Sequence, residues 1–126
     1  MKIIDAPNAP KAIGPYSQGI NFNNLVFTSG QIPIDPITNN LIKGDFKKEV
    51  IQVLKNLDII LLDGGSSLKD IIKLSVFLVD LAKFSELNKV FKLYFKDNLP
   101  ARSVVEVSAL PLGANVKIEA IGGINR

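Results

Sequence analysis

Residues 70–80, "DIIKLSVFLVD", form the clearest single strand pattern in the sequence, and the rest of the chain can be arranged around it. Successive side chains of a strand point to opposite faces of the sheet. One face of this strand carries four aliphatic side chains, Ile72, Leu74, Val76 and Leu78. The other face mixes apolar and polar side chains, Ile71, Lys73, Ser75, Phe77 and Val79. We expect helices on the first face, and burial of the second, half-apolar face against another subunit.

Helical spacing of apolar residues predicts one helix on each side of this strand. Asp45 is a plausible N-cap for a helix over about 46 to 62, and Gly64-Gly65 supplies its stop. Its apolar positions are Phe46, Val50, Val53, Leu57, Ile60 and Leu61. A second helix over about 83 to 96 cannot continue through Pro100. Its apolar stripe consists of Phe84, Leu87, Phe91 and either Tyr94 or Phe95.

Shorter patterns predict the remaining strands. Residues 17–22 and 25–29 flank the turn "NFNN", residues 102–108 and 116–122 close the chain, and residues 2–4 form an edge strand. Two helices and about six strands pack best with both helices on one sheet face. The predicted fold is therefore a single α+β domain covering residues 1–126.

The last two strands place charged residues beside apolar ones. We expect the inward sets to be Val105 and Val107 in the first strand, and Val116, Ile118 and Ala120 in the second. The opposite sets are Arg102, Val104 and Glu106, then Lys117, Glu119 and Ile121. Alternation thus predicts that Arg102 and Glu119 share the helix-free face. Arg102, the only arginine besides Arg126, can also be read as a rim cation paired with a surface acid.

Composition limits the chemistry that the chain can perform. It has no histidine and no cysteine, which excludes the usual catalytic triads, thiol chemistry and zinc sites with nitrogen or sulfur ligands. The net charge is +3, and the thirteen lysines are scattered rather than gathered in a stripe, which argues against a nucleic-acid ligand. No stretch has the length of a signal peptide or a membrane span, so we expect a cytoplasmic protein.

Two short motifs have ordinary structural explanations when each is taken alone. "GPYSQG", residues 14–19, fits a turn with a packed aromatic ring, and "FTSGQIP", residues 27–33, ends a strand in Ser29-Gly30. Together with "DGGSSLKDIIKLSVFLVD", "PARSVVEV" and "VKIEAIG", however, they occur in an order and spacing that resemble the Rid (reactive intermediate deaminase) family, also called the YjgF family. The resemblance covers essentially the whole chain.

This resemblance implies a fold similar to that of the trimeric bacterial chorismate mutases, and a homotrimer with a ligand cleft between subunits. The implied activity is that of a 2-iminobutanoate/2-iminopropanoate deaminase, which hydrolyses 2-imino acids to 2-oxo acids and ammonia without a metal or organic cofactor. The family's motif positions fall on Arg102, Glu119, Tyr16, Ser29 and Gly30 of this sequence.

One position departs from the family pattern. Many members have a cysteine two residues after the motif arginine, and this chain has Val104 there. We expect Arg102 to bind the substrate carboxylate and Glu119 to activate water. Tyr16, Ser29, Gly30 and Val104 would then line the substrate-binding pocket. Two other functions stay open, an endoribonuclease or translation inhibitor of the same family, and a non-catalytic trimer that binds a small acid and regulates a partner.

Overall fold

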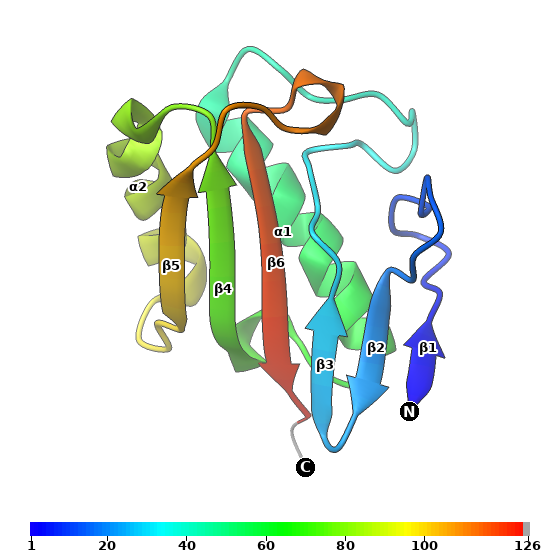
Figure 1. Cartoon of the computed structure of the whole chain (residues 1–126). Coiled ribbons are helices and arrows are strands. Elements are labelled where there is room, and N and C mark those ends of the chain that lie inside the picture. The colour runs from blue at the N-terminus through cyan, green and yellow to red at the C-terminus, as the bar shows by residue number, and fades with distance from the viewer. Residues whose placement is uncertain (125–126) are drawn as a thin grey trace.

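The computed structural model describes residues 1–124 and has one six-stranded sheet with two helices on one face (Figure 1). The strand order is β1-β2-β3-β6-β4-β5. The elements are β1 (Lys2–Ile4), β2 (Gly19–Phe22), β3 (Leu25–Thr28), α1 (Phe46–Asp63), β4 (Ile71–Leu78), α2 (Phe84–Phe95), β5 (Ala101–Glu106) and β6 (Val116–Gly123). Short 3-10 turns occur at Leu68–Asp70, Leu81–Lys83 and Pro111–Gly113. The predicted single-domain α+β architecture is confirmed.

Strand β4 lies between β6 and β5 and is therefore an internal strand of the sheet. It pairs antiparallel with β6 but parallel with β5. A parallel pair needs a crossover connection, and α2 supplies it by carrying the chain across one face of the sheet. The direction of this crossover fixes where β5 begins, and therefore where Arg102 stands.

The hydrophobic core lies between the two helices and the sheet. Helix α1 begins at the N-cap Asp45, whose carboxylate accepts a hydrogen bond from the Lys48 N–H. It ends at Gly64, where an added Cβ would lie only 2.6 Å from Ile4 Cδ1, so the close contact between helix end and β1 requires glycine. Fully buried side chains of this core include Val50, Val53, Leu54, Leu57, Leu74, Leu78, Leu87 and Ile118.

One detail of the central strand differs from the prediction. Leu74, Val76 and Leu78 are buried beneath the helices as expected, but Ile72 is half exposed and Ile71 is buried in its place. The register of β4 against β6 shifts between Ile71 and Lys73. Such a β-bulge breaks the simple two-residue alternation, and sequence periodicity alone does not reveal it.

The helix-free face of the sheet is open to solvent in the single chain (Figure 1). Phe27 is 37% exposed and Val105 is 45% exposed, while Phe77 and Ile121 are partly exposed between them. This half-apolar surface matches the face for which the sequence predicts burial against another subunit; the trimer itself stays a prediction. Within residues 1–124, no helix is both long and apolar enough to cross a membrane.

Candidate active site

Arg102 and Glu119 lie on opposite faces of the sheet, so the prediction that they share the helix-free face is wrong. Arg102 pairs with Leu74 of β4, whose side chain is buried beneath the helices. Glu119 pairs with Ser75, the next residue along β4. Because directly paired residues project to the same face of a sheet, Arg102 takes the helix side and Glu119 the helix-free side.

The prediction failed because it assigned the wrong set of alternate residues in strand β5 to the helix-covered face. The β5 sequence "SVVEV" presents valines in both alternation phases, and the prediction took Val105 as inward. In the structure Val104 packs against the core, whereas Val105 is exposed on the helix-free face. Val104 therefore supports the core and lines neither of the two pockets described below.

The Arg102 guanidinium is held in place by residues of helix α2. Its Nη2 donates a 2.6 Å hydrogen bond to Asn88 Oδ1. Its central carbon lies 5.2 Å from the centre of the Phe84 ring and 5.4 Å from that of Phe91. Within residues 1–124 its partners include no acid, since the only ion pair there joins Lys83 to Glu86. Arg102 therefore has no acidic partner among these residues, contrary to its reading as a rim cation paired with an acid.

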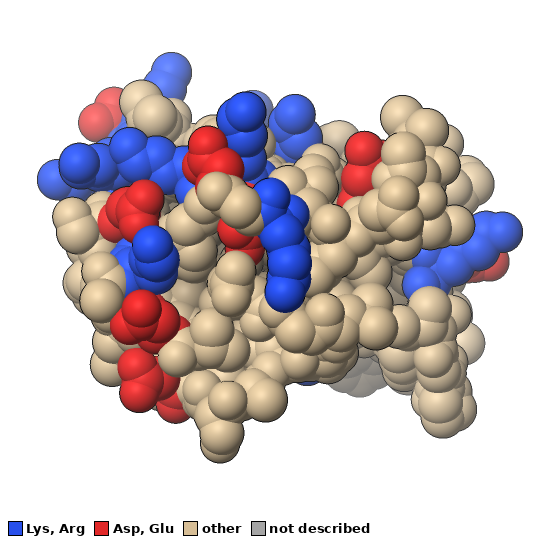
Figure 2. Space-filling model, turned by 90° about the horizontal axis from the view of Figure 1, so that it is seen from above, with Lys and Arg blue, Asp and Glu red and all other residues tan. Residues whose placement is uncertain are grey.

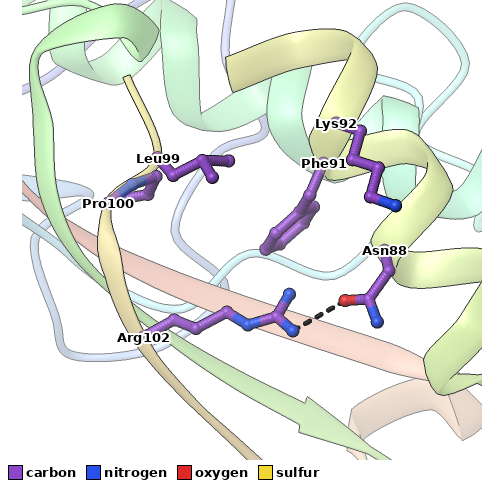
Figure 3. Close-up of a pocket in the computed structure, with 6 residues that line it drawn as sticks. All are labelled: Asn88, Phe91, Lys92, Leu99, Pro100 and Arg102. Atoms are coloured by element: carbon purple, nitrogen blue, oxygen red, sulfur yellow. Dashed lines mark hydrogen bonds between the residues drawn. The ribbon is translucent and has the colours of Figure 1, made fainter. Parts of the chain in front are cut away.

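A pocket of about 320 Å³ opens beside this guanidinium. Figure 3 shows Leu99 and Pro100 on the side of the chain entering β5, with the Phe91 ring above the Arg102 side chain. Its lining is largely apolar around one guanidinium, a composition that suits a small carboxylate with a hydrocarbon part. We call it the arginine pocket; its lining residues are Asn88, Phe91, Lys92, Leu99, Pro100 and Arg102.

Four of the predicted site residues meet in a second pocket, of about 310 Å³, on the helix-free side. We call it the glutamate pocket; its lining residues are Tyr16, Ser29, Gly30, Lys117 and Glu119. The structure thus brings Tyr16, Ser29, Gly30 and Glu119 together, and separates them from Arg102.

A bulge between β3 and β6 shapes the glutamate pocket. Phe27 pairs with Ile121 and Gln31 pairs with Ile118, so residues 28–30 stand opposite only residues 119 and 120. The extra residue interrupts the backbone ladder. The Thr28 side chain takes the place of a backbone acceptor there, because its Oγ1 accepts a 3.0 Å hydrogen bond from the Ala120 N–H.

Some of the polar groups at this bulge already form hydrogen bonds within the chain. The Ser29 hydroxyl donates a 2.6 Å hydrogen bond to the Ser17 carbonyl, and the Ser29 N–H donates to the Gln18 carbonyl at 2.8 Å. Because its one proton is used, the hydroxyl can only accept a further hydrogen bond. The Gly30 N–H has no hydrogen-bond partner within residues 1–124. The glutamate pocket therefore offers a donor, an acceptor and a carboxylate to one ligand.

Sequence reasoning assigned no site role to six of the residues that line these pockets, Asn88, Phe91, Lys92, Leu99, Pro100 and Lys117. Asn88 lies four residues after Phe84 and three before Phe91, so helical spacing puts all three on neighbouring positions. The sequence signal for Asn88 was a polar residue at the edge of the apolar stripe of the second predicted helix. Lys117 alternates with Ile118 on β6, two residues before Glu119, and its position was predicted without a role.

The chain matches the family described as Endoribonuclease L-PSP over residues 6–124. A RutC family protein of Pyrococcus horikoshii is 49% identical over 120 residues, which are 95% of each chain. The human protein named 2-iminobutanoate/2-iminopropanoate deaminase is 40% identical over 120 residues, covering 95% of this chain and 88% of the human one.

Solved structures agree with these sequence matches. A Rid family protein from Yersinia pestis is 48% identical with a TM-score of 0.93, and 98% of each chain is covered. Escherichia coli TdcF, solved with bound serine, is 41% identical with a TM-score of 0.93, covering 99% of this chain and all of the other. Fold and pockets define a small α+β protein with a partly buried guanidinium and an exposed carboxylate on opposite sheet faces. The chain belongs to the Endoribonuclease L-PSP family, which confirms the Rid resemblance.

A first prediction concerns the aromatic support of Arg102. Phe84 is 40% exposed, so Phe84→Leu should alter stability little. Losing one ring of the cation–π arrangement, worth about 0.5–1 kcal/mol, should weaken binding of 2-oxobutanoate about two- to fivefold. Calorimetric titration measures this. Phe22→Leu is the matched control, because Phe22 is 49% exposed and lines neither pocket. Equal affinities in both variants would mean that Phe84 does not position the guanidinium.

Proposed function

We propose that this protein hydrolyses 2-imino acids to 2-oxo acids and ammonia, in clefts that two subunits of a homotrimer build together. The observation that carries the proposal is the division of the charged groups. Strand β4 lies between β5 and β6, so the Arg102 and Glu119 backbones are two strand spacings apart, about 10 Å. Their side chains also leave the sheet in opposite directions. One small ligand cannot contact both within a chain, but it can between two chains.

The arginine pocket would hold the substrate carboxylate. One Nη2 proton is occupied by Asn88, and the remaining guanidinium N–H groups form a planar fork for two carboxylate oxygens. The two flanking rings and the hydrogen bond restrict the guanidinium, which reduces the conformational entropy lost on binding. The apolar lining from Phe91, Leu99 and Pro100 suits a short hydrocarbon side chain.

The glutamate pocket of the neighbouring subunit would perform the hydrolysis. The Ser29 oxygen, which can only accept, suits the N–H of a protonated imine. Glu119 takes a proton from water as the water oxygen bonds to C2 and the C=N π electrons move to nitrogen. Glu119 returns that proton to the nitrogen, and the C–N bond breaks. The remaining hydroxyl becomes the C=O group, and its proton leaves with ammonia as ammonium.

A second candidate function is that of a non-catalytic trimer that binds a small acid. It is favoured by the related TdcF structure, which was solved with bound serine. The endoribonuclease alternative has less support, because the chain has no histidine. On the face seen in Figure 2, lysine and arginine atoms gather toward the upper left, with aspartate and glutamate atoms lying beside them.

A coupled assay separates the two candidates. Threonine dehydratase converts threonine to 2-iminobutanoate, and the appearance of 2-oxobutanoate is followed with and without this protein. Acceleration beyond the spontaneous rate supports hydrolysis. Binding of 2-oxobutanoate without any acceleration would instead support the non-catalytic acid-binding trimer.

A second prediction concerns assembly. Because the helix-free face is half apolar and each pocket supplies only part of the chemistry, we expect a closed cyclic trimer with three equivalent clefts. Multi-angle light scattering at micromolar concentration should give three times the chain mass of 13.7 kDa. A monomer under these conditions would remove the basis for a shared cleft.

A further inference from the structure

Lys117 is the only cation among the residues that line the glutamate pocket, and the proposed hydrolysis gives it no task. It projects from β6 on the helix-free face, opposite Phe77 of β4 and two residues before Glu119. The pocket therefore holds an ammonium group as well as a carboxylate. Hydrolysis of a 2-imino acid with an apolar side chain uses only the carboxylate.

The position of Lys117 depends on the absence of a side chain at Gly30. A Cβ added to Gly30 would overlap Lys117 Cε and would lie 3.1 and 3.2 Å from its Cγ and Cδ. The lysine stem thus packs along the Gly30 backbone, the same residue whose N–H is open to a ligand. This packing keeps the ammonium group close to the pocket instead of leaving it to extend into solvent.

The charge of Lys117 has no acidic partner within the described part of the chain. The ion pair between Lys83 and Glu86 is the only one among residues 1–124, so Lys117 and Glu119 do not neutralise each other by direct contact. An unpaired cation beside an unpaired carboxylate attracts a ligand that brings a negative group of its own. Without Lys117, Glu119 would repel a second carboxylate on the substrate.

We propose that Lys117 makes the site accept 2-imino acids that carry a second carboxylate, the imines of acidic amino acids. This inference rests on the proposed function. Arg102 of one subunit would hold the carboxylate next to C2, and Lys117 of the next subunit the distal carboxylate. Glu119, two residues from Lys117 on the same strand, remains available to activate water.

The test compares two stable 2-oxo acids as probes, 2-oxoglutarate with a second carboxylate and 2-oxobutanoate without one. Lys117→Met keeps the stem that covers Gly30 and removes the charge. We expect it to lower the affinity for 2-oxoglutarate relative to 2-oxobutanoate about tenfold or more, the scale of a charged hydrogen bond. Lys117→Glu should lower this ratio further. Lys69→Met, at an exposed lysine outside the pocket, is the matched control and should leave the ratio unchanged.

Turnover of the two corresponding imines is a second measurement. An amino-acid oxidase produces them in the cuvette, one from glutamate and the other from 2-aminobutanoate. The kcat/KM ratio of the two imines should fall in Lys117→Met by a similar factor. An unchanged affinity ratio overturns the inference, including the case in which Lys117→Met merely weakens the trimer. If the wild-type protein hydrolyses neither imine, the proposed function fails, and the calorimetric ratio still decides the role of Lys117.

Discussion

Glu119→Gln is expected to slow imine hydrolysis about a hundredfold or more while the trimer stays intact. The substitution keeps the size of the side chain and removes its ability to take a proton from water. Loss of one positioned acid–base group typically costs a factor of about 10²–10⁴. Glu119 is exposed in the single chain and makes no ion pair within residues 1–124, so the fold does not depend on its charge.

The loss should appear in kcat more than in the affinity for 2-oxobutanoate, because glutamine still fills the pocket. Glu86→Gln is the matched control, since it removes an acid from an exposed ion pair on α2 and should leave turnover unchanged. Wild-type kcat in Glu119→Gln would show that water is activated by another group, and the mechanism given above would have to be abandoned.

Arg102→Lys should reduce kcat/KM about ten- to hundredfold although it preserves the charge. Lysine offers no planar fork, cannot stack between the Phe84 and Phe91 rings, and leaves the Asn88 amide oxygen without its 2.6 Å partner. The loss of a charged two-point contact corresponds to about 1.5–3 kcal/mol. Calorimetry should show a matching decrease in affinity for 2-oxobutanoate. An unchanged kcat/KM would mean that the guanidinium does not contact the substrate.

Mixing the two impaired variants, Arg102→Lys and Glu119→Gln, tests whether the cleft is shared. If Arg102 and Glu119 of each cleft come from different subunits, unfolding and refolding an equal mixture should restore activity. A cleft then has an intact arginine in half of the cases and an intact glutamate in half, so about a quarter of the clefts should work. A site within one chain would give no recovery, because every chain lacks one residue.

The sequence predicted the architecture well because its strongest patterns are long and regular. Helix α1, with its cap at Asp45 and stop at Gly64, lies within one residue of the predicted bounds. The arrangement of the site was predicted less well. In strand β5 the run Val104-Val105 satisfies either alternation phase, and only the parallel register with β4 decides between them. That register depends on the α2 crossover, a tertiary feature that periodicity does not contain.

The bulges are the second reason for incomplete prediction. Because of the bulge between Ile71 and Lys73, Ile71 is buried in place of the predicted Ile72. The bulge at Ser29-Gly30 shapes the glutamate pocket. Neither has a distinctive local sequence signal beyond a glycine. The family resemblance named Ser29 and Gly30 without explaining them. The structure supplies the reason, since the extra residue frees the Gly30 N–H from the ladder.

If the cleft is shared as proposed, a chain can fold before it becomes active, because its apolar sheet face is still exposed at that stage. The core between helices and sheet is made by residues of one chain, so a chain can bury it without a partner. Completing a shared cleft requires an encounter between chains, and its rate rises with their concentration. Freshly synthesised protein would therefore be folded but inactive until it assembles. During this time Phe27 and Val105 remain exposed to other chains. In a dilute compartment that delay, and not the stability of the chain, would limit how soon the protein begins to work.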